Sequence, residues 1–373
     1  MQFLCLLINQ FKKVLLTYLC PMKILLIGQG ITGTWLSYWL NQMGAEVIVM
    51  DEARPNTSTR VASGVINPVT GRSVVTTWLA ETLLPFSEEH YATIGGVIGS
   101  QIISKCGVLS FPPSDQMYDA YLHRIAQGEH YIHTVKNFDH WNSFFRFSYG
   151  AVLIQPAYWT DLQTLLTGWR QWLQQNGWLR EERFDETQLQ VHADGISYQD
   201  IQADYIFYCD GMQSAESRYW SGLPFSLNKG EALIVDIPGL PHGQIYKFGI
   251  TTLVPWQNGQ WWVGSNYDNN YYDELPTALF RKRAEQLLEQ VLKIPFTITD
   301  HLAAIRPTNL ERRPFAGLHP HAPRVGILGG MGTKGVSIAP WLARQVAAHI
   351  LEGSTIEPAA SIDRFRRAFD QPL

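Results

Sequence analysis

Three glycines near the start of the chain have the spacing of a phosphate-binding turn. Gly28, Gly30 and Gly33 form G-x-G-x-x-G between an apolar run at 24–27 and a segment with helical spacing at 31–43. In such a turn the first glycine makes the tight bend and the second lets the backbone approach a pyrophosphate. The third lets the helix pack closely against the sheet. The pattern therefore predicts a strand, a turn and a helix built to hold a dinucleotide.

An acidic pair completes this unit. Asp51 follows a second apolar strand at 46–50, and Glu52 comes directly after it. A carboxylate at this position accepts hydrogen bonds from a ribose 2′-OH and disfavours a 2′-phosphate, which argues against NADP. The helix N-terminus, at Ile31 and Thr32, offers free N–H groups to the phosphates. Strand, helix, second strand and acid are in register, so we expect a dinucleotide site here.

Composition excludes several other functions. The chain has 373 residues, enough for two domains with sizeable cores, and its net charge of -4 gives no electrostatic footprint for nucleic acid. Its four cysteines show neither C-x-x-C nor metal-ligand spacing, so we expect a reducing, cytoplasmic compartment and no metal. No run of 18 apolar residues is present, so we expect no membrane span.

The first 21 residues precede the first predicted strand and allow three interpretations. A signal peptide is disfavoured, because the apolar run is short and Lys12 and Lys13 interrupt it instead of preceding it. An amphipathic surface helix is the second interpretation. The third, which we favour, is that Met22 is the true start and that 1–21 is a misassigned extension.

The strand-loop-helix pattern of the first 50 residues recurs twice, near 203–218 and 325–351, with strand-rich segments between. This recurrence predicts an α/β protein whose dinucleotide-binding domain is discontinuous. We assign residues 22–98, 150–224 and 318–373 to that domain. A second domain with an antiparallel sheet is then inserted at 99–149 and 225–317.

Local signals predict further elements. Ser114 caps a helix that runs to about Ala126, and Asp161 starts a helix over 162–175. Residues 76–90 have helical spacing. Residues 101–111 predict a strand, a turn at Gly107 and a second strand.

Seven blocks in a fixed order extend these observations over nearly all of 22–352. They lie at Gly28 to Asp51, Ala62 to Pro68, Ala203 to Gly211, Lys229 to Glu231, Leu253 to Ser265, Ala304 to Gly317, and Gly329 to Pro340. With these blocks the chain resembles the FAD-dependent oxidoreductases of the D-amino-acid oxidase, glycine oxidase and sarcosine oxidase family. The resemblance implies a Rossmann-like FAD-binding domain of the glutathione-reductase type, with an inserted antiparallel-sheet substrate domain.

The resemblance also implies a set of cofactor residues. Ser63 and Gly64 match the loop that passes the flavin, and Gly211 keeps the turn after a strand. The loop before the last helix would place that helix N-terminus beside the flavin, where N–H groups and the helix dipole stabilise negative charge; its residues are Gly330, Met331, Gly332, Thr333, Lys334 and Gly335. No cysteine lies beyond Cys209, so we expect FAD to be bound non-covalently.

Arg306 matches the family's carboxylate-binding arginine, whose planar fork can hold a substrate carboxylate. Tyr246, Lys247 and Tyr267 lie on predicted substrate-domain strands. They could orient an amine or form a lid over the pocket, and the alternative is that they are half-buried strand residues without a functional role. Trp262 stands where sarcosine oxidases carry a lysine that promotes reaction with oxygen.

The leading prediction is an enzyme that oxidises the C–N bond of a small amino acid or secondary amine by hydride transfer to flavin N5. Its electron acceptor would be O2, a quinone or another carrier. One alternative is the flavoprotein domain of tRNA wobble-uridine modification, against which the lack of a basic face argues. Others are an NAD-dependent dehydrogenase and a flavin-binding protein without turnover.

Overall fold

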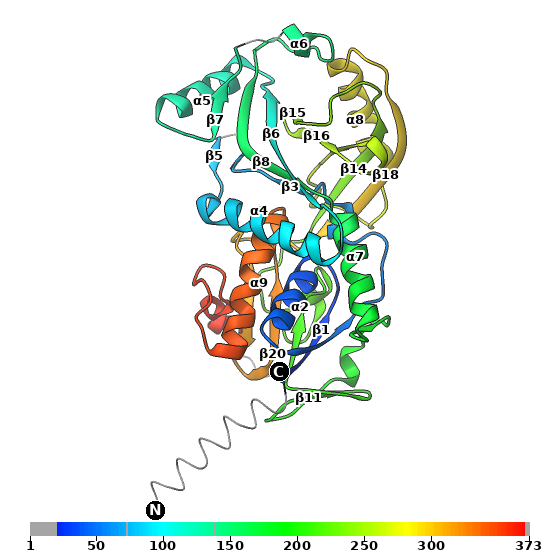
Figure 1. Cartoon of the computed structure of the whole chain (residues 1–373), viewed down its shortest axis with the longest axis vertical. Helices are drawn as coiled ribbons and strands as arrows, with labels where there is room; N and C mark the ends of the chain where they lie inside the picture. The colour runs from blue at the N-terminus through cyan, green and yellow to red at the C-terminus, as the bar shows by residue number, and fades with distance from the viewer. Residues whose placement is uncertain (1–20, 72–73, 137–138, 370–373) are drawn as a thin grey trace, which may run out of the picture.

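The computed structural model of the chain describes residues 21–71, 74–136 and 139–369, shown in Figure 1. In these ranges the larger sheets are one of six strands and one of nine, with smaller sheets of three and two strands. The predictions made for residues 1–21 lie outside the described residues, except at residue 21. Within the described ranges no helix is long and apolar enough to cross a membrane.

The first sheet has the order β19-β20-β13-β1-β2-β9. Its strands are β1 (Lys23–Ile27), β2 (Glu46–Met50), β9 (Leu179–Arg180), β13 (Tyr205–Tyr208), β19 (Phe315–His319) and β20 (Ala322–Gly329). All neighbours are parallel except β19 and β20. The continuous apolar runs of β1 and β13 fit this position, because a central parallel strand is buried on both faces.

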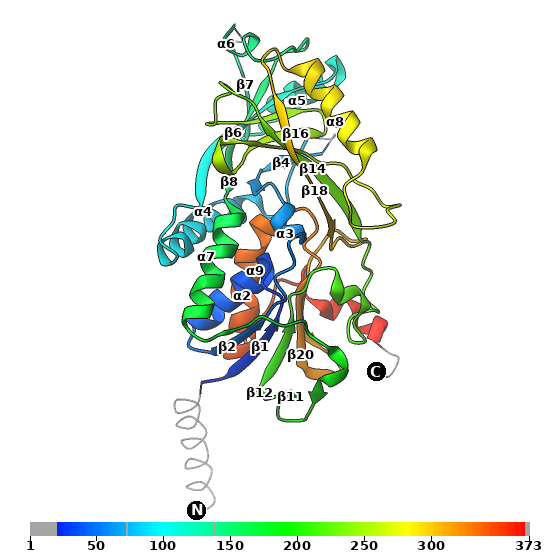
Figure 2. The ribbon, with the colours of Figure 1, turned by 90° about the vertical axis from the view of Figure 1, so that its right-hand side faces the viewer.

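Alternate residues of β1 serve the two faces of the first sheet. Ile24 and Leu26 pack in one core with the helices α2 (Ile31–Gln42), α4 (Ala80–Val97), α7 (Leu162–Gln175) and α9 (Gly335–Glu352). Leu25 and Ile27 pack in another core, against the three-stranded sheet of β10 (Gln190–Val191), β11 (Ile196–Tyr198) and β12 (Ile201–Ala203). Figure 2 shows these helices and the small sheet on opposite sides of β1 and β20.

The second sheet lies above the first in Figure 1, with the order β18-β14-β17-β16-β15-β6-β8-β3 and with β7 paired to β8. Its strands are β3 (Val65–Ile66), β6 (Ile103–Phe111), β7 (Ile132–Thr134), β8 (Val152–Thr160), β14 (Asn228–Asp236), β15 (Ile245–Phe248), β16 (Thr251–Pro255), β17 (Trp261–Gly264) and β18 (Thr297–Arg306). Helices α5 (Asp115–Ala126), α6 (Asp139–Asn142) and α8 (Ala278–Val291) belong to this part. The pairing is antiparallel except between β15 and β6.

The remaining elements are short. They are α3 (Ser58–Val61), β4 (Val69–Thr70), β5 (Val75–Thr76) and the 3-10 turns at Glu186–Gln188, Gln213–Glu216, Gln257–Gly259 and Ile362–Phe369. The turn at 362–369 lies against the β19 side of the first sheet, since Ile362 and Phe369 are in its core.

The predicted N-cap residues gave the correct starts of two helices. The side chain of Ser114 accepts a hydrogen bond from the Met117 N–H, and that of Asp161 accepts one from the Thr164 N–H, so both predicted starts are confirmed. The turn predicted at Gly107 is wrong: β6 runs through it with a register shift against β8 between Cys106 and Val108. A bulge and a turn share the same glycine signal, and only the partner strand distinguishes them.

The strand pairing also differs from two of the predicted domain boundaries. β8, at 152–160, pairs with β6 in the second sheet, although the prediction placed residues after 149 with the dinucleotide domain. β19 begins at Phe315 and pairs in the first sheet, three residues before the predicted boundary at 318. Hydrophobic patterns identify strands but not their partners, so the sequence could not assign these edges.

Candidate active site

A cavity of about 1620 Å³ lies between the two sheets. It runs from the turn between β1 and α2 to the N-terminus of α9, and β14 to β18 form its other wall. Sites for one small molecule usually measure ~300–1,000 Å³, so this space suits a large ligand together with a small one. Its walls contain most of the residues that the sequence singled out.

The glycine turn has the geometry expected of it. Gly28 has φ 95°, and a Cβ there would lie 2.7 Å from the carbonyl oxygen of Cys209. A Cβ on Gly33 would lie 1.9 Å from the Gly28 carbonyl oxygen, so only glycine lets α2 approach this closely. A Cβ on Gly30 would meet only the Thr59 hydroxyl, at 3.3 Å. Because Gly30 has no side chain, its backbone is accessible from the cavity.

The N-terminus of α2 faces the same space, and its N-cap residue, Gly30, has no side chain to cap it. The Ile31 N–H donates to Thr59 Oγ1 at 3.1 Å, and the Thr32 hydroxyl donates to the Cys209 carbonyl at 3.3 Å. No acidic residue lies in the first turn. A helix N-terminus with N–H groups open to a cavity is a binding site for anions such as phosphates.

Asp51 lies at the end of β2 on the cavity wall, next to the exposed Glu52. Its Oδ1 pairs with Arg170 Nη1 at 2.8 Å and accepts the Ala53 N–H at 2.9 Å. Its Oδ2 accepts the Gln29 N–H at 2.8 Å. A carboxylate has about four acceptor sites, so Oδ2 keeps one for a hydroxyl group. Arg170, which the sequence did not single out, thus fixes the predicted ribose-binding acid.

The loop before α9 forms the far end of the cavity. Gly330 and Gly332 have φ 65° and 57°, a conformation that favours glycine. The side-chain amide of Asn309 donates to the Gly330 carbonyl at 2.9 Å, and the Gly332 N–H donates to the Pro307 carbonyl at 3.1 Å. No side chain caps α9. A second helix N-terminus is thereby held open to the same cavity.

Lys334 adds a cation at this N-terminus. Its side chain has no hydrogen bond or ion pair to any described residue, and it lines the cavity. Burial, followed by the charge of Lys247, lowers the pKa of Lys334 to about 8. Such a group favours an anion in the adjoining space, because a bound negative charge would stabilise its protonated form.

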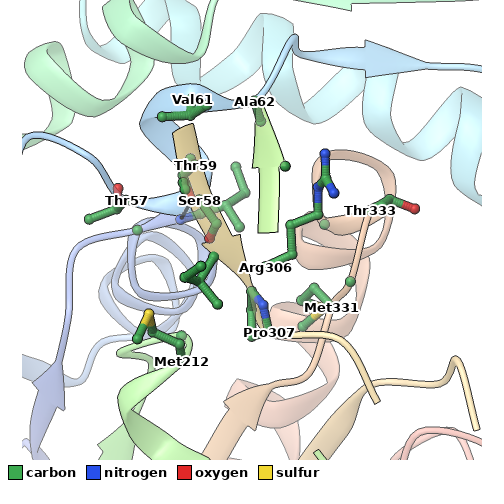
Figure 3. A pocket seen from close by; sticks show the side chains of 18 of the residues that line it. Thr57, Ser58, Thr59, Val61, Ala62, Met212, Arg306, Pro307, Met331 and Thr333 are labelled. Atoms are coloured by element: carbon green, nitrogen blue, oxygen red, sulfur yellow. Dashed lines mark hydrogen bonds between the residues drawn. The ribbon is translucent and has the colours of Figure 1, made fainter. Parts of the chain in front are cut away.

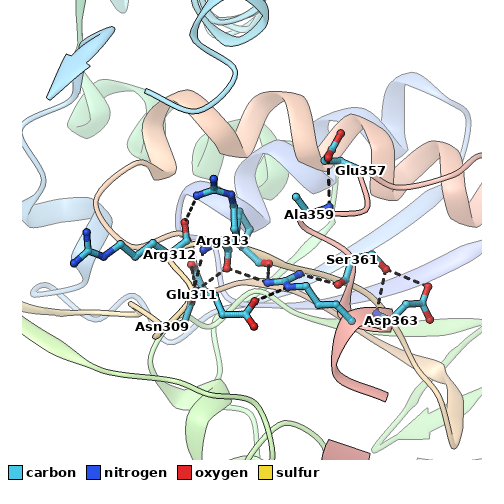
Figure 4. A network of polar contacts seen from close by, with 11 residues as sticks. Asn309, Glu311, Arg312, Arg313, Glu357, Ala359, Ser361 and Asp363 are labelled. Carbon is cyan, nitrogen blue, oxygen red and sulfur yellow. Dashed lines mark hydrogen bonds and ion pairs between the residues drawn. The ribbon is translucent and has the colours of Figure 1, made fainter. Parts of the chain in front are cut away.

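A network of polar contacts joins the segment 309–314 to the loop before α9 and to Arg364 (Figure 4). Asn309 also donates to the Arg313 carbonyl at 2.7 Å. Arg364 donates to the Pro314 carbonyl at 2.7 Å and pairs with Glu311 Oε2 at 2.9 Å. Burial lowers the pKa of Arg364, and its guanidinium stacks over a ring of Phe365. The segment 309–314 is therefore fixed on both sides.

Arg306 ends β18 and points into the cavity. Its Nη1 donates to Asn228 Oδ1 at 2.8 Å and to the Asn266 carbonyl at 3.1 Å. Its Nη2 donates to Ser265 Oγ at 2.8 Å. Each of these partners is neutral, and burial lowers the pKa of the guanidinium. Among the described residues nothing accepts from Nε, so the fork keeps donors for a ligand carboxylate.

Gly230 makes room for this side chain. A Cβ on Gly230 would lie 1.9 Å from Arg306 Nη2 and 2.1 Å from its Cζ. The ring of Tyr267, 64% exposed, lies 4.9 Å from the guanidinium carbon on the other side. Figure 3 shows Arg306 and Pro307 between the segment of Thr57 to Ala62 and the loop of Met331 and Thr333.

Tyr246 does not reach the cavity. Its side chain is 0% exposed, its hydroxyl donates to the Pro241 carbonyl at 2.7 Å, and it packs in the core of the second sheet. The predicted catalytic role is therefore not supported by its position. Successive strand residues face opposite sides of a sheet. Lys247, the next residue on β15, accordingly lines the cavity, and a sequence pattern alone could not fix which neighbour would do so.

The other predicted residues divide in the same way. Those on the cavity wall are Gly28, Gly30, Ile31, Thr32, Asp51, Glu52, Ser63, Gly211, Arg306 and the whole loop of Gly330, Met331, Gly332, Thr333, Lys334 and Gly335. Gly33 and Gly64 lie behind the wall. A Cβ on Gly64 would lie 1.9 Å from the Thr160 carbonyl oxygen, so this glycine joins the loop closely to β8.

Trp262, Glu231 and Asp210 lie on the cavity wall and have defined contacts or surroundings. The Trp262 ring lines the cavity and donates to the Val61 carbonyl at 2.9 Å. Glu231 is buried and accepts from the Thr277 N–H and hydroxyl at 2.6 and 2.8 Å. Asp210 lies at the glycine-turn end, where burial raises its pKa to about 6. No group of three or more potential metal ligands occurs among the described residues.

Sequence reasoning missed the partners that orient Arg306. Asn228, Ser265 and Asn266 come from two other segments and carry no spacing signal. Gly230 did carry one, since it lies in the Lys-Gly-Glu block, but its use as space for a guanidinium needs the strand pairing of β14 with β18.

Comparison with known proteins agrees with this geometry. The family model of the FAD dependent oxidoreductases, DAO, matches residues 23–349. The chain belongs to this family. It is therefore an FAD-dependent oxidoreductase of the amino-acid and amine oxidase type.

Solved structures share the fold at low identity. Iminodiacetate oxidase from Chelativorans sp. BNC1 is 19% identical with a TM-score of 0.75, covering 92% of this chain and 98% of that one. Glycine oxidase from Geobacillus kaustophilus is 16% identical with a TM-score of 0.72 and the same coverage. L-proline dehydrogenase from P. horikoshii is 16% identical with a TM-score of 0.74, covering 93% of this chain and 98% of that one.

The residues present fit FAD. The open α2 N-terminus and Gly30 would hold the pyrophosphate, and Asp51 has an acceptor for a ribose hydroxyl. The α9 N-terminus and Lys334 would lie at the flavin end. Cys209 lines the cavity beside the Gly28 turn, and burial raises the pKa of its thiol, so it stays a neutral thiol at neutral pH.

Proposed function

We propose that this enzyme oxidises the C–N bond of a small amino acid or secondary amine that carries a carboxylate. The observation behind this proposal is Arg306, a half-buried arginine in the cavity whose described partners are all neutral. A charge in such a place needs a counterion, and the cavity has room for one. FAD, when bound, would supply the chemistry by accepting a hydride from the substrate carbon at N5.

The residues of the chain would position and polarise the reactants. Arg306 would hold the substrate carboxylate, and Asn228 and Ser265 would fix the fork so that the Cα–H has one orientation. Lys334 and the α9 N-terminus would stabilise negative charge at the flavin end. Tyr267 would cover the guanidinium and exclude water from the ion pair. The imine product would then be hydrolysed by water.

The test is anaerobic bleaching of the flavin absorbance by a panel of amino acids, N-alkyl amino acids and simple amines. We expect carboxylate-bearing amines to bleach the flavin and their decarboxylated analogues to do so much more slowly. If no member bleaches it, the chain is a flavin-binding protein without turnover on these substrates. Reoxidation of the bleached enzyme by air or by a quinone then identifies the acceptor.

A further inference from the structure

A second cation on the cavity wall is not used by the proposed carboxylate site. Lys247 on β15 lines the cavity and is half-buried. Among the described residues, no acceptor or carboxylate lies within hydrogen-bond or ion-pair distance of its ammonium group. Burial lowers the pKa of Lys247, with no nearby acid to raise it. An ammonium that is partly removed from water and has no partner is unfavourable in free energy, so its position needs an explanation.

The chain supplies counterions to comparable side chains elsewhere. Lys229, which is 1% exposed, pairs with Asp273 at 3.5 Å. Glu231, an acid on the same wall, accepts from the Thr277 N–H and hydroxyl and lies 3.1 Å from His301 Nε2, with no ion pair to Lys247. Lys247 is therefore left for something that enters the cavity.

Positive charge is concentrated on this side of the cavity. Lys247 is near enough to Lys334 to lower its pKa, and Arg306 lines the same space with only neutral partners. Lys334, at the α9 N-terminus, serves the cofactor in the proposed function, and Arg306 serves one carboxylate. In the proposed function the cofactor is the partner of Lys334 and the substrate carboxylate is the partner of Arg306. The third cation, Lys247, has no partner.

Strand pairing gives the separation. Lys247 pairs with Thr252, which pairs with Gly264, and Ser265 next to it accepts from Arg306. Adjacent strands lie about 4.8 Å apart, so the Lys247 backbone is roughly 10 Å across the sheet from Gly264. Both long side chains extend into the cavity, with Thr252 on the wall between. Their charged ends can reach two groups a few bonds apart on one small molecule.

We propose that the substrate carries two anionic groups, with one carboxylate on Arg306 and a second anion on Lys247 and the Thr252 hydroxyl. This inference rests on the proposed function and names its substrate class, an amine dicarboxylate or a close analogue. Lys247 acts away from the reacting carbon, so it determines specificity and is not a catalytic residue. A monoacid would leave its ammonium desolvated and unpaired, which is how a polar pocket rejects the wrong ligand.

Binding to the FAD-loaded enzyme tests this without turnover. The probes are malonate, succinate and glutarate, each against its monoamide, which has the same shape and one charge fewer. Perturbation of the flavin spectrum gives the dissociation constants. We expect at least one diacid to bind roughly tenfold tighter than its monoamide or more, as for a charge-assisted hydrogen bond.

Variants assign that preference to Lys247. Lys247→Met and Lys247→Gln should each bring the diacid-to-monoamide ratio close to one, while Lys282→Met, an exposed lysine on α8, should leave it unchanged. Flavin content of each variant checks folding. A wild type without the preference at any chain length, or equal weakening of both probes by both variants, overturns the inference.

A turnover arm separates this inference from the proposed function. Iminodiacetate and N-isobutylglycine, which has an isopropyl group in place of one carboxylate, are compared by anaerobic bleaching. Faster bleaching by iminodiacetate that Lys247→Met abolishes supports both proposals. Bleaching by both substrates at equal rates supports the oxidation and overturns the two-anion substrate. Diacid binding through Lys247 with no bleaching by any amine keeps the anion site and rejects the oxidation.

Discussion

At the scale of single residues, the site depends on how one guanidinium is held. Asn228, Asn266 and Ser265 use the Nη1 hydrogens and one on Nη2, which leaves Nε and part of Nη2 for a carboxylate. Lysine in the same place would keep the charge and lose the planar fork. Orientation of the substrate should then suffer more than attraction.

Arg306→Lys should keep FAD and slow the reductive half-reaction of carboxylate-bearing amines. A lost charge-assisted hydrogen bond costs roughly 1.5–3 kcal/mol, or about 10- to 150-fold in kcat/KM. The measurement is anaerobic stopped-flow bleaching with an amino acid and its decarboxylated analogue. Equal losses on both would mean that Arg306 is structural, and no loss on either would remove it from the site.

Gly230→Ala should also slow the reductive half-reaction, although Arg306 itself is not substituted. The added methyl would occupy the space of Nη2, so the guanidinium must leave its hydrogen-bond partners. We expect a loss of catalytic efficiency at least as large as for Arg306→Lys, with ~1–3 kcal/mol of destabilisation from overpacking. Gly96→Ala, in α4 with nothing within 4 Å, is the matched control. Normal turnover in Gly230→Ala would show that the fork tolerates another position.

Lys334 should make FAD affinity depend on pH. Its pKa of about 8 lies below that of a free lysine, so it is protonated below pH 8 and neutral above. Its attraction for negative charge is therefore present at pH 7 and is lost as pH rises through 8, or somewhat higher once an anion is bound. We expect about fivefold weaker FAD binding at pH 9 than at pH 7, equivalent to ~1 kcal/mol for a partly exposed charge pair.

Lys334→Met is the control for that pH profile. It should bind FAD as weakly at pH 7 as the wild type does at pH 9, and its own profile should be flatter. Parallel profiles in the two proteins would assign the pH dependence to another group. The cofactor-free wild type should instead gain stability as pH rises above 8, because its unfolded state then binds more protons than its folded state.

At the scale of elements, the loop before α9 is held by the segment that follows β18. Asn309, 5% exposed, donates to the Gly330 and Arg313 carbonyls. Asn309→Ala would leave the buried Gly330 carbonyl without this donor, a cost of about 1–3 kcal/mol, while the Arg313 carbonyl would keep its hydrogen bond from Arg364 Nη2 at 3.2 Å. We expect faster FAD dissociation, followed by flavin fluorescence, and a lower unfolding midpoint. Asn270→Ala, at an exposed site, should change neither. Unaltered dissociation in Asn309→Ala would mean that the loop holds its own shape.

The sequence predicted these elements unevenly. Capped helices were located closely, as with α5 and α7, because Ser114 and Asp161 give local signals that do not depend on the rest of the fold. α4 runs from Ala80 to Val97, where helical spacing had indicated 76–90. Its start has no side-chain cap, so no residue type marked it. Helix starts marked by a capping side chain could be predicted from the sequence, while helix ends without such a cap could not.

The site shows the same limit. Gly28 and Gly33 were assigned correctly because their roles lie within one strand-turn-helix unit. Tyr246 was placed in the site and Lys247 was given no more than a possible role, because the face of β15 depends on its pairing with β6 and β16. The groups that accept hydrogen bonds from Arg306 come from segments about 40 and 78 residues away, and no local pattern joins them.

At the scale of the whole molecule, the cavity joins two sheets, so ligand binding should stabilise both. We expect the purified protein to be yellow and to release its flavin on heating or acid treatment, since the Cys209 thiol lies at the Gly28 turn and its pKa is raised. Free FAD at 100 times its Kd adds ~2.7 kcal/mol to the free energy of unfolding. Calorimetry with and without added FAD measures the shift in Tm. Flavin that remains on the denatured chain would contradict non-covalent binding.

The residues that line the cavity are far apart in the sequence, and their order along the chain affects when the cavity can form during translation. Gly28 to Asp51 leaves the ribosome early, but the loop at 329–335 that faces it emerges only after both sheets have been translated. A nascent chain that lacks this loop would therefore have only the part of the cavity wall proposed to hold the FAD phosphates. It would lack the part proposed to contact the flavin ring. We therefore expect FAD to bind only after most of the chain has been translated.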